Sequence, residues 1–117
     1  MLAVGEHEGE LSEQAIRMSN AFCGGVASSH EELCGALSAG MMVIGSRYGR
    51  ITADVSDKPS LAAAAELRKR FIEHFGTTKC DPIRKQQKKC VWVVEDASRM
   101  IFDVLDEDWE QVAASSS

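Results

Sequence analysis

The sequence lacks a long apolar run and a signal-like N-terminus. No stretch approaches the roughly 18 consecutive apolar residues that a membrane-spanning helix requires. The first residues, MLAVGEHEGE, are acidic and have no apolar segment of the kind that secretory signals carry. We therefore expect no membrane span and a cytoplasmic location, where permanent disulfides are rare.

The motifs of several enzyme classes are also missing. The chain has no G-x-S-x-G turn, no phosphate-binding loop and no H-E-x-x-H zinc motif. It has no C-x-x-C, so a thioredoxin-like mechanism is not indicated. Basic residues are few, with 13 Lys and Arg against 18 Asp and Glu, for a net charge of −5. Phosphate binding needs a basic surface, and we therefore expect no nucleic-acid partner.

What the sequence does contain suffices for one globular domain, since 44% of its 117 residues are hydrophobic. Apolar residues recur at helical spacing, which predicts an all-α fold, a small bundle of about four helices. We expect these helices near residues 12–22, 29–48, 57–75 and 87–111. The expected organisation is a flexible N-terminus at 1–10, a single helical domain at 11–112 and a disordered tail at 113–117.

Helix boundaries follow from capping residues and prolines. Ser29 and Glu32 have the S-x-x-E spacing of a capping box, which predicts that the second helix begins there. Gly76 predicts the end of the third helix. Pro82 disfavours helix at the residue before it, so we expect a connector between the third and last helices, with Cys80 inside it.

Small residues gather after the second of the four cysteines, in the segment CGALSAG. Glycine inside a helix costs about 1 kcal/mol relative to alanine, so two glycines here indicate that something approaches the backbone closely. A neighbouring helix is one explanation. The other is a cofactor, a substrate or a second thiol near Cys34, in which case Gly35, Ala36 and Gly40 would be the binding residues.

Glycines and cysteines follow one another in a set order: Gly24-Gly25, Cys34-Gly35-Ala36, Tyr48-Gly49, Phe75-Gly76, Cys80 and Cys90. Over about residues 20–105, this order resembles the redox-active protein family named for its C_GCAxxG_C_C pattern. Two positions depart from that pattern. No cysteine precedes Cys23, which stands where the family usually has glycine, and Ala39 replaces the last glycine of the C-G-A-x-x-G element, with Gly40 directly after it.

The resemblance implies a redox role for Cys34, Cys80 and Cys90, by thiol–disulfide exchange or electron transfer. The protein would then be a thiol-based oxidoreductase that acts on a redox partner protein or a small molecule. Basic residues surround the last two cysteines, and positive charge favours the reactive thiolate form of cysteine. We expect these three thiols to converge near the glycine-rich turn of the second helix, with Cys23 close by.

Two other interpretations stay open at this point. Cys23, Cys34, Cys80 and Cys90 are sufficient in number to bind a metal ion or an iron–sulfur cluster, although their spacing matches no standard motif. Alternatively, the protein is a non-catalytic helical binding or assembly module whose cysteines are inert and buried. Such a small bundle could form a homodimer through a spare apolar stripe.

Overall fold

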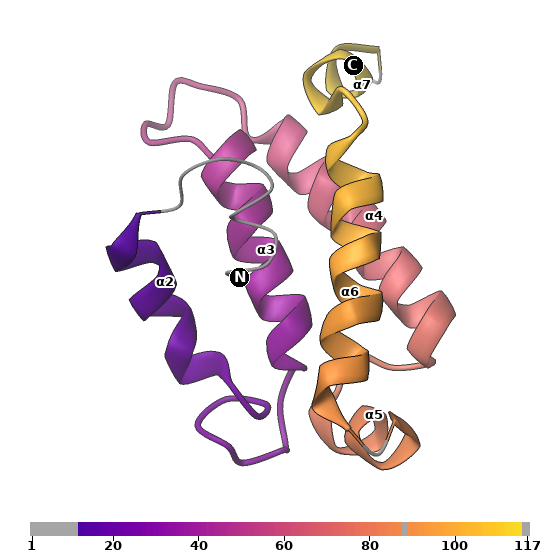
Figure 1. Ribbon diagram of the computed structural model, residues 1–117. Coiled ribbons are helices and arrows are strands. Elements are labelled where there is room, and N and C mark those ends of the chain that lie inside the picture. The colour runs from indigo at the N-terminus through magenta and orange to yellow at the C-terminus, as the bar shows by residue number, and fades with distance from the viewer. Residues whose placement is uncertain (1–11, 88, 116–117) are drawn as a thin grey trace.

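The computed structural model describes residues 12–87 and 89–115, without the side chains of residues 90, 114 and 115. This part of the chain contains six α-helices, one 3-10 turn and no β-strand (Figure 1). The all-α prediction is confirmed, whereas the predicted count of about four helices is too low. The flexible segment expected at 1–10 lies outside the described residues, and the tail expected at 113–117 overlaps the last helix as far as residue 115.

The N-terminal helical segment matches its predicted position. It comprises α2 (Glu13–Ser19) and the 3-10 turn η1 (Asn20–Phe22). Ser12 caps α2, since its Oγ accepts a hydrogen bond of 3.1 Å from the backbone N–H of Ala15. None of the α2 side chains is fully buried. The segment therefore lies on the outside of the bundle, against α3.

The next helix, α3 (Gly35–Tyr48), begins later than the capping-box pattern at Ser29 predicts. Just before α3, Leu33 forms an isolated antiparallel bridge with Lys79. Backbone hydrogen bonds on both sides of this bridge hold the two segments together. The same residues cannot be extended and helical at once, so the predicted helix start is wrong, and the helix begins only where the bridge ends.

The longest helix, α4 (Lys58–Phe75), has the predicted bounds. Pro59 occupies its first turn, where a missing backbone N–H has no cost, and Gly76 ends it in the left-handed conformation at φ +78°. One face of α4 is fully buried and forms the centre of the core; its buried residues are Ala63, Leu67, Phe71 and Phe75.

A short helix, α5 (Cys80–Gln87), replaces the predicted connector. Pro82 lies in the first turn, where its missing N–H has no intrahelical partner to lose, so it starts the helix rather than preventing it. Asp81 and Lys85 form an i,i+4 ion pair on α5, with Lys85 Nζ 2.9 Å from Asp81 Oδ2.

The predicted last helix is divided in two, α6 (Cys90–Leu105) and α7 (Trp109–Ser115). The chain turns at residues 106–108, which allows Trp109 to pack back into the core with 5% of its surface exposed. Its indole Nε1 donates a hydrogen bond of 2.6 Å to the carbonyl of Val104. Burial of this large side chain against α4 outweighs continuation of the helix.

The helices α3, α4 and α6 pack against one another and enclose the core. Figure 1 shows α3 and α6 with their N-terminal ends at the same end of the molecule, where α5 also lies. Gly40 of α3 permits the close packing of α4 and α6 against it, because a Cβ there would be 2.9 Å from side-chain atoms of both Leu67 and Ile101. Within the described residues, no helix combines the length and apolar character needed to cross a bilayer.

Candidate functional site: a cysteine-lined pocket

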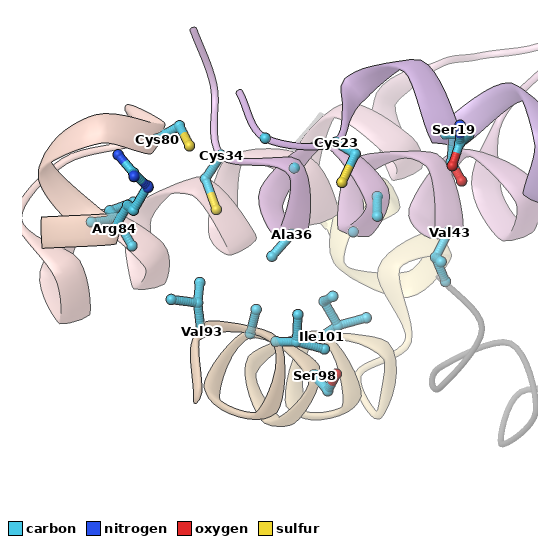
Figure 2. A pocket seen from close by; sticks show the side chains of 18 residues that line it. Ser19, Cys23, Cys34, Ala36, Val43, Cys80, Arg84, Val93, Ser98 and Ile101 are labelled. Atoms are coloured by element: carbon cyan, nitrogen blue, oxygen red, sulfur yellow. The ribbon is translucent and has the colours of Figure 1, made fainter. Parts of the chain in front are cut away.

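A pocket with a volume of about 290 Å³ lies between the α2–η1 segment and α6, with α3 as its floor (Figure 2). We call it the cysteine pocket. Small side chains of α3 leave the space open, and aliphatic side chains of α6 form the opposite wall. The residues that line it are Ser19, Asn20, Cys23, Gly24, Cys34, Gly35, Ala36, Ala39, Gly40, Val43, Cys80, Ile83, Arg84, Val93, Val94, Ala97, Ser98 and Ile101.

Three of the four cysteines reach this pocket as thiols. Cys34 and Cys80 are buried, each with 8% of its surface exposed, whereas Cys23 is exposed. In Figure 2, Cys34 and Cys80 lie at one end of the pocket and Cys23 lies farther along it. The side chain of Cys90 is outside the described residues, so the predicted convergence of this fourth cysteine stays a prediction.

The bridge between Leu33 and Lys79 determines how the two buried cysteines face each other. The backbone N–H of Cys34 donates to Thr78 and that of Cys80 donates to Glu32, both at 2.8 Å. Successive side chains of extended segments alternate between faces, so the residues that follow each bridge partner point to the same side. Cys34 and Cys80 are therefore diagonal neighbours on one face, although 45 residues separate them in the sequence.

Three cysteines also begin helices. Cys34 is the N-cap of α3, Cys80 is the first residue of α5 and Cys90 is the first residue of α6. The N-terminus of a helix carries a partial positive charge from its aligned peptide dipoles, which stabilises negative charge nearby. In general, such positive charge favours the thiolate form of cysteine, whereas burial in apolar surroundings opposes it. Sequence reasoning placed Cys34 a turn farther into its helix, because it started that helix too early.

A left-handed turn packs directly against Cys80. Residues 24–28 all have positive φ angles, between +55° and +70°. Gly25 lies so close to Cys80 that a Cβ added there would be 2.5 Å from Cys80 Cβ and 3.1 Å from its Sγ. Ser29 Oγ holds the turn in place by donating to the Gly25 carbonyl at 2.8 Å. Glycine at this position therefore leaves the space that Cys80 occupies.

Among the described residues that line the cysteine pocket, Arg84 is the only one with a charged side chain. It follows Cys80 by one helical turn, and Figure 2 shows it at the same end of the pocket as Cys34 and Cys80. Its Nη1 is 3.8 Å from Asp81 Oδ1, a longer separation than that between Asp81 and Lys85. The hydrogen bond from Lys85, aided by the charges of Lys85 and Arg84, lowers the pKa of Asp81.

The other basic residues expected near the thiols do not line this pocket. Lys79 lines a separate polar hollow with Asp81 and Pro82, and Lys89 Nζ lies 5.6 Å from the centre of the Trp92 ring. Lys88 lies outside the described residues. Arg84 is therefore the one residue of the predicted basic set that the described structure brings to the cysteine pocket.

The small residues of α3 have separate roles. Gly40 allows close packing of α4 and α6, as the helix-packing interpretation predicts. Gly35 lies against the backbone of η1 and the residues after it, since a Cβ there would be 3.1 Å from the carbonyl oxygen of Phe22. Ala36 and Ala39 face the pocket. A binding role for Gly35, Ala36 and Gly40 stays a prediction.

The arrangement of the described side chains also bears on the metal interpretation. Among the residues that the structure describes, no group of three His, Cys, Asp or Glu side chains is arranged to hold a metal ion. Cys23, Cys34 and Cys80 line one pocket without forming such a group. A site that includes the Cys90 sulfur lies outside the described side chains, so this interpretation is neither supported nor contradicted.

Sequence reasoning missed the bridge that pairs the two buried cysteines and the α6 wall opposite them. The helical spacing of apolar residues indicates core positions at Ala97 and Ile101, but it does not single out the wall residue Val93. A weak signal for the bridge exists, because Thr77 and Thr78 are β-branched and favour extended backbone. Its partner segment around Leu33 carries no such signal, and one extended residue pair is too short to recognise from sequence pattern.

Comparison with protein families identifies a relationship for this chain. A family model described as "Putative redox-active protein (C_GCAxxG_C_C)" matches residues 1–104 of this chain. No curated protein sequence and no solved structure matches it significantly.

Proposed function

We propose that this chain, which belongs to the C_GCAxxG_C_C family of redox-active proteins, uses Cys34 and Cys80 as a dithiol that exchanges with disulfides. The family supports a redox role in general terms. The pairing of these two cysteines is supported by one observation above all, the bridge that turns both side chains to the same face beside the pocket.

The proposed reaction transfers two electrons. The thiolate of Cys80 attacks one sulfur of a substrate disulfide, which forms a mixed disulfide and releases the first substrate thiolate. The thiolate of Cys34 then attacks the Cys80 sulfur, which forms the Cys34–Cys80 disulfide and releases the second substrate thiolate. The two protons from the protein thiols are available to the released thiolates. The substrate is reduced and the protein is oxidised by the same two electrons.

We assign the attacking role to Cys80 because Arg84 follows it by one turn on α5. A nearby guanidinium and a helix N-terminus both stabilise a thiolate. Diagonal neighbours in an antiparallel pair have Cα atoms about 7–8 Å apart, and a disulfide needs about 4.4–6.8 Å. Closing the disulfide therefore requires the segments around the bridge to move together by about 1 Å. We place this chemistry in the reducing cytoplasm, where a reductant can restore the dithiol.

Mild oxidation of the protein is expected to lower its intact mass by two hydrogens, and peptide mapping is expected to find Cys34 linked to Cys80. Cys80→Ser should abolish this link. Cys34→Ser should instead accumulate a mixed disulfide with a small probe such as 2-hydroxyethyl disulfide, because no second thiol completes the exchange.

Cys23→Ser is the matched control, since Cys23 lines the same pocket but does not lie next to a residue of the bridge. It should form the Cys34–Cys80 disulfide as the unaltered protein does. The proposal is wrong if oxidation links other cysteines and leaves Cys34 and Cys80 reduced. A metal adduct on protein purified without oxygen would favour the metal interpretation, and an unchanged mass after oxidation would favour inert cysteines.

A further inference from the structure

We infer that the cysteine pocket binds a small, mostly apolar carboxylate, with its hydrocarbon part between α3 and α6 and its carboxylate against Arg84. The inference rests on the proposed function at one point only, where it takes the bound molecule to be a member of the substrate class. The binding itself is a separate property of the reduced protein.

The walls of the pocket determine the apolar part of this ligand. Aliphatic side chains of α6 face the methyl groups of Ala36 and Ala39 across the open space, as Figure 2 shows for Val93 and Ala36. A volume of about 290 Å³ is at the lower end of the range for small-molecule sites. Burial of hydrocarbon between such walls is favourable by about 0.8 kcal/mol for each CH₂ group.

The charge at one end of the pocket determines the polar part. Arg84 is the only charged residue in the part of the lining that the structure describes, and its side chain is 51% exposed. Asp81 is its nearest carboxylate, but that group is held more closely by Lys85. A guanidinium has five N–H donors in a planar fork, so it can accept a ligand carboxylate in addition to this distant ion pair.

The burial of the thiols favours a small molecule over a protein as the substrate. Cys34 and Cys80 are each 8% exposed, so a disulfide on the surface of a folded partner could not reach their sulfurs without displacing the chain around them. A molecule that enters the pocket meets both cysteines at the end where Arg84 also lies.

Binding is tested by calorimetry on the reduced protein, with fatty carboxylates as probes and without any oxidant. From butanoate to octanoate, affinity should rise by up to about fourfold for each added CH₂ and level off once the chain fills the pocket. Heptanol, which has the same alkyl chain with a hydroxyl in place of the carboxylate, should bind three- to fivefold more weakly than octanoate, as is typical of a half-exposed ion pair.

Arg84→Gln should remove this preference for octanoate and leave the affinity for heptanol unchanged. Lys69→Gln is the matched control, because Lys69 is an exposed cation on α4 that does not line the pocket. This control variant should keep the preference for octanoate over the alcohol. Ala39→Leu, at a half-buried lining position, should weaken both probes about tenfold, with thermal melting used to confirm that the variant is folded.

The inference is overturned if affinity does not change with chain length, or if heptanol binds the unaltered protein as tightly as octanoate. Neither result bears on the proposed function, because no disulfide forms in this experiment. Conversely, failure of Cys34 and Cys80 to become linked on oxidation would leave the binding result standing.

Discussion

Gly25→Ala is expected to lower the free energy of unfolding by about 2–5 kcal/mol and to slow formation of the Cys34–Cys80 disulfide. Two causes add. The residue has a φ of +70°, where a side chain costs about 1–2 kcal/mol. In addition, the new Cβ would lie 2.5 Å from Cys80 Cβ, and relieving such an overlap in a packed site costs about 1–3 kcal/mol.

Gly76→Ala separates these two causes. Gly76 has a similar φ of +78°, but among the described residues, apart from its own chain neighbours, no atom lies within 4 Å of the Cβ that alanine would add there. This control should lose only the backbone part, about 1–2 kcal/mol, and should form the disulfide at the normal rate. Urea denaturation of the reduced proteins gives the stabilities, and mass spectrometry at timed intervals after oxidation gives the rates. Equal losses for the two variants would show that Gly25 does not determine the position of Cys80.

Leu67→Ala is expected to lower the free energy of unfolding by about 2–5 kcal/mol, as is typical of a buried leucine truncated to alanine. Leu67 is 1% exposed in the centre of α4 and lies directly against Gly40 of α3. The cavity left by its removal would loosen the contact between these helices. Because α3 forms the floor of the cysteine pocket, affinity for octanoate should fall as well.

Leu61→Ala is the matched control on the same helix. Leu61 is 60% exposed, so its truncation should change the stability by no more than about 0.5 kcal/mol. Both variants are compared by urea denaturation, and an unchanged slope with denaturant concentration shows that the unfolding transition remains comparable. If the two variants lost the same stability, the buried face of α4 would not be the centre of the core.

Local signals in the sequence correctly predicted some elements of the fold. Ser12 and Gly76 mark helix ends by chemistry that acts within one turn, and the helices they bound were placed within a few residues. The all-helical class followed from the apolar period. These features depend on neighbours along the chain, which a sequence displays directly.

Elements governed by distant contacts were predicted poorly. Ser29 has a capping pattern, yet the bridge of Leu33 to Lys79 holds the following residues extended. Trp109 ends α6 early because it packs on a helix about 40 residues away in the sequence. The set of three redox cysteines came from the family pattern, whereas the face shared by Cys34 and Cys80 comes from that same bridge. No periodicity carries this information, because it depends on which segments meet in space.

The bridge also has a consequence for how the chain must be made. In an unfolded chain, disulfides form preferentially between cysteines that are close in sequence, because closing a long loop costs more entropy. Cys80 and Cys90 are separated by nine residues, against 45 for Cys34 and Cys80, which favours the shorter loop by roughly tenfold. In concentrated urea, oxidation should therefore pair Cys80 mainly with Cys90. In the folded protein, oxidation should instead pair Cys80 with Cys34. A chain oxidised before it folds would therefore carry the wrong connectivity until a reductant restores its thiols.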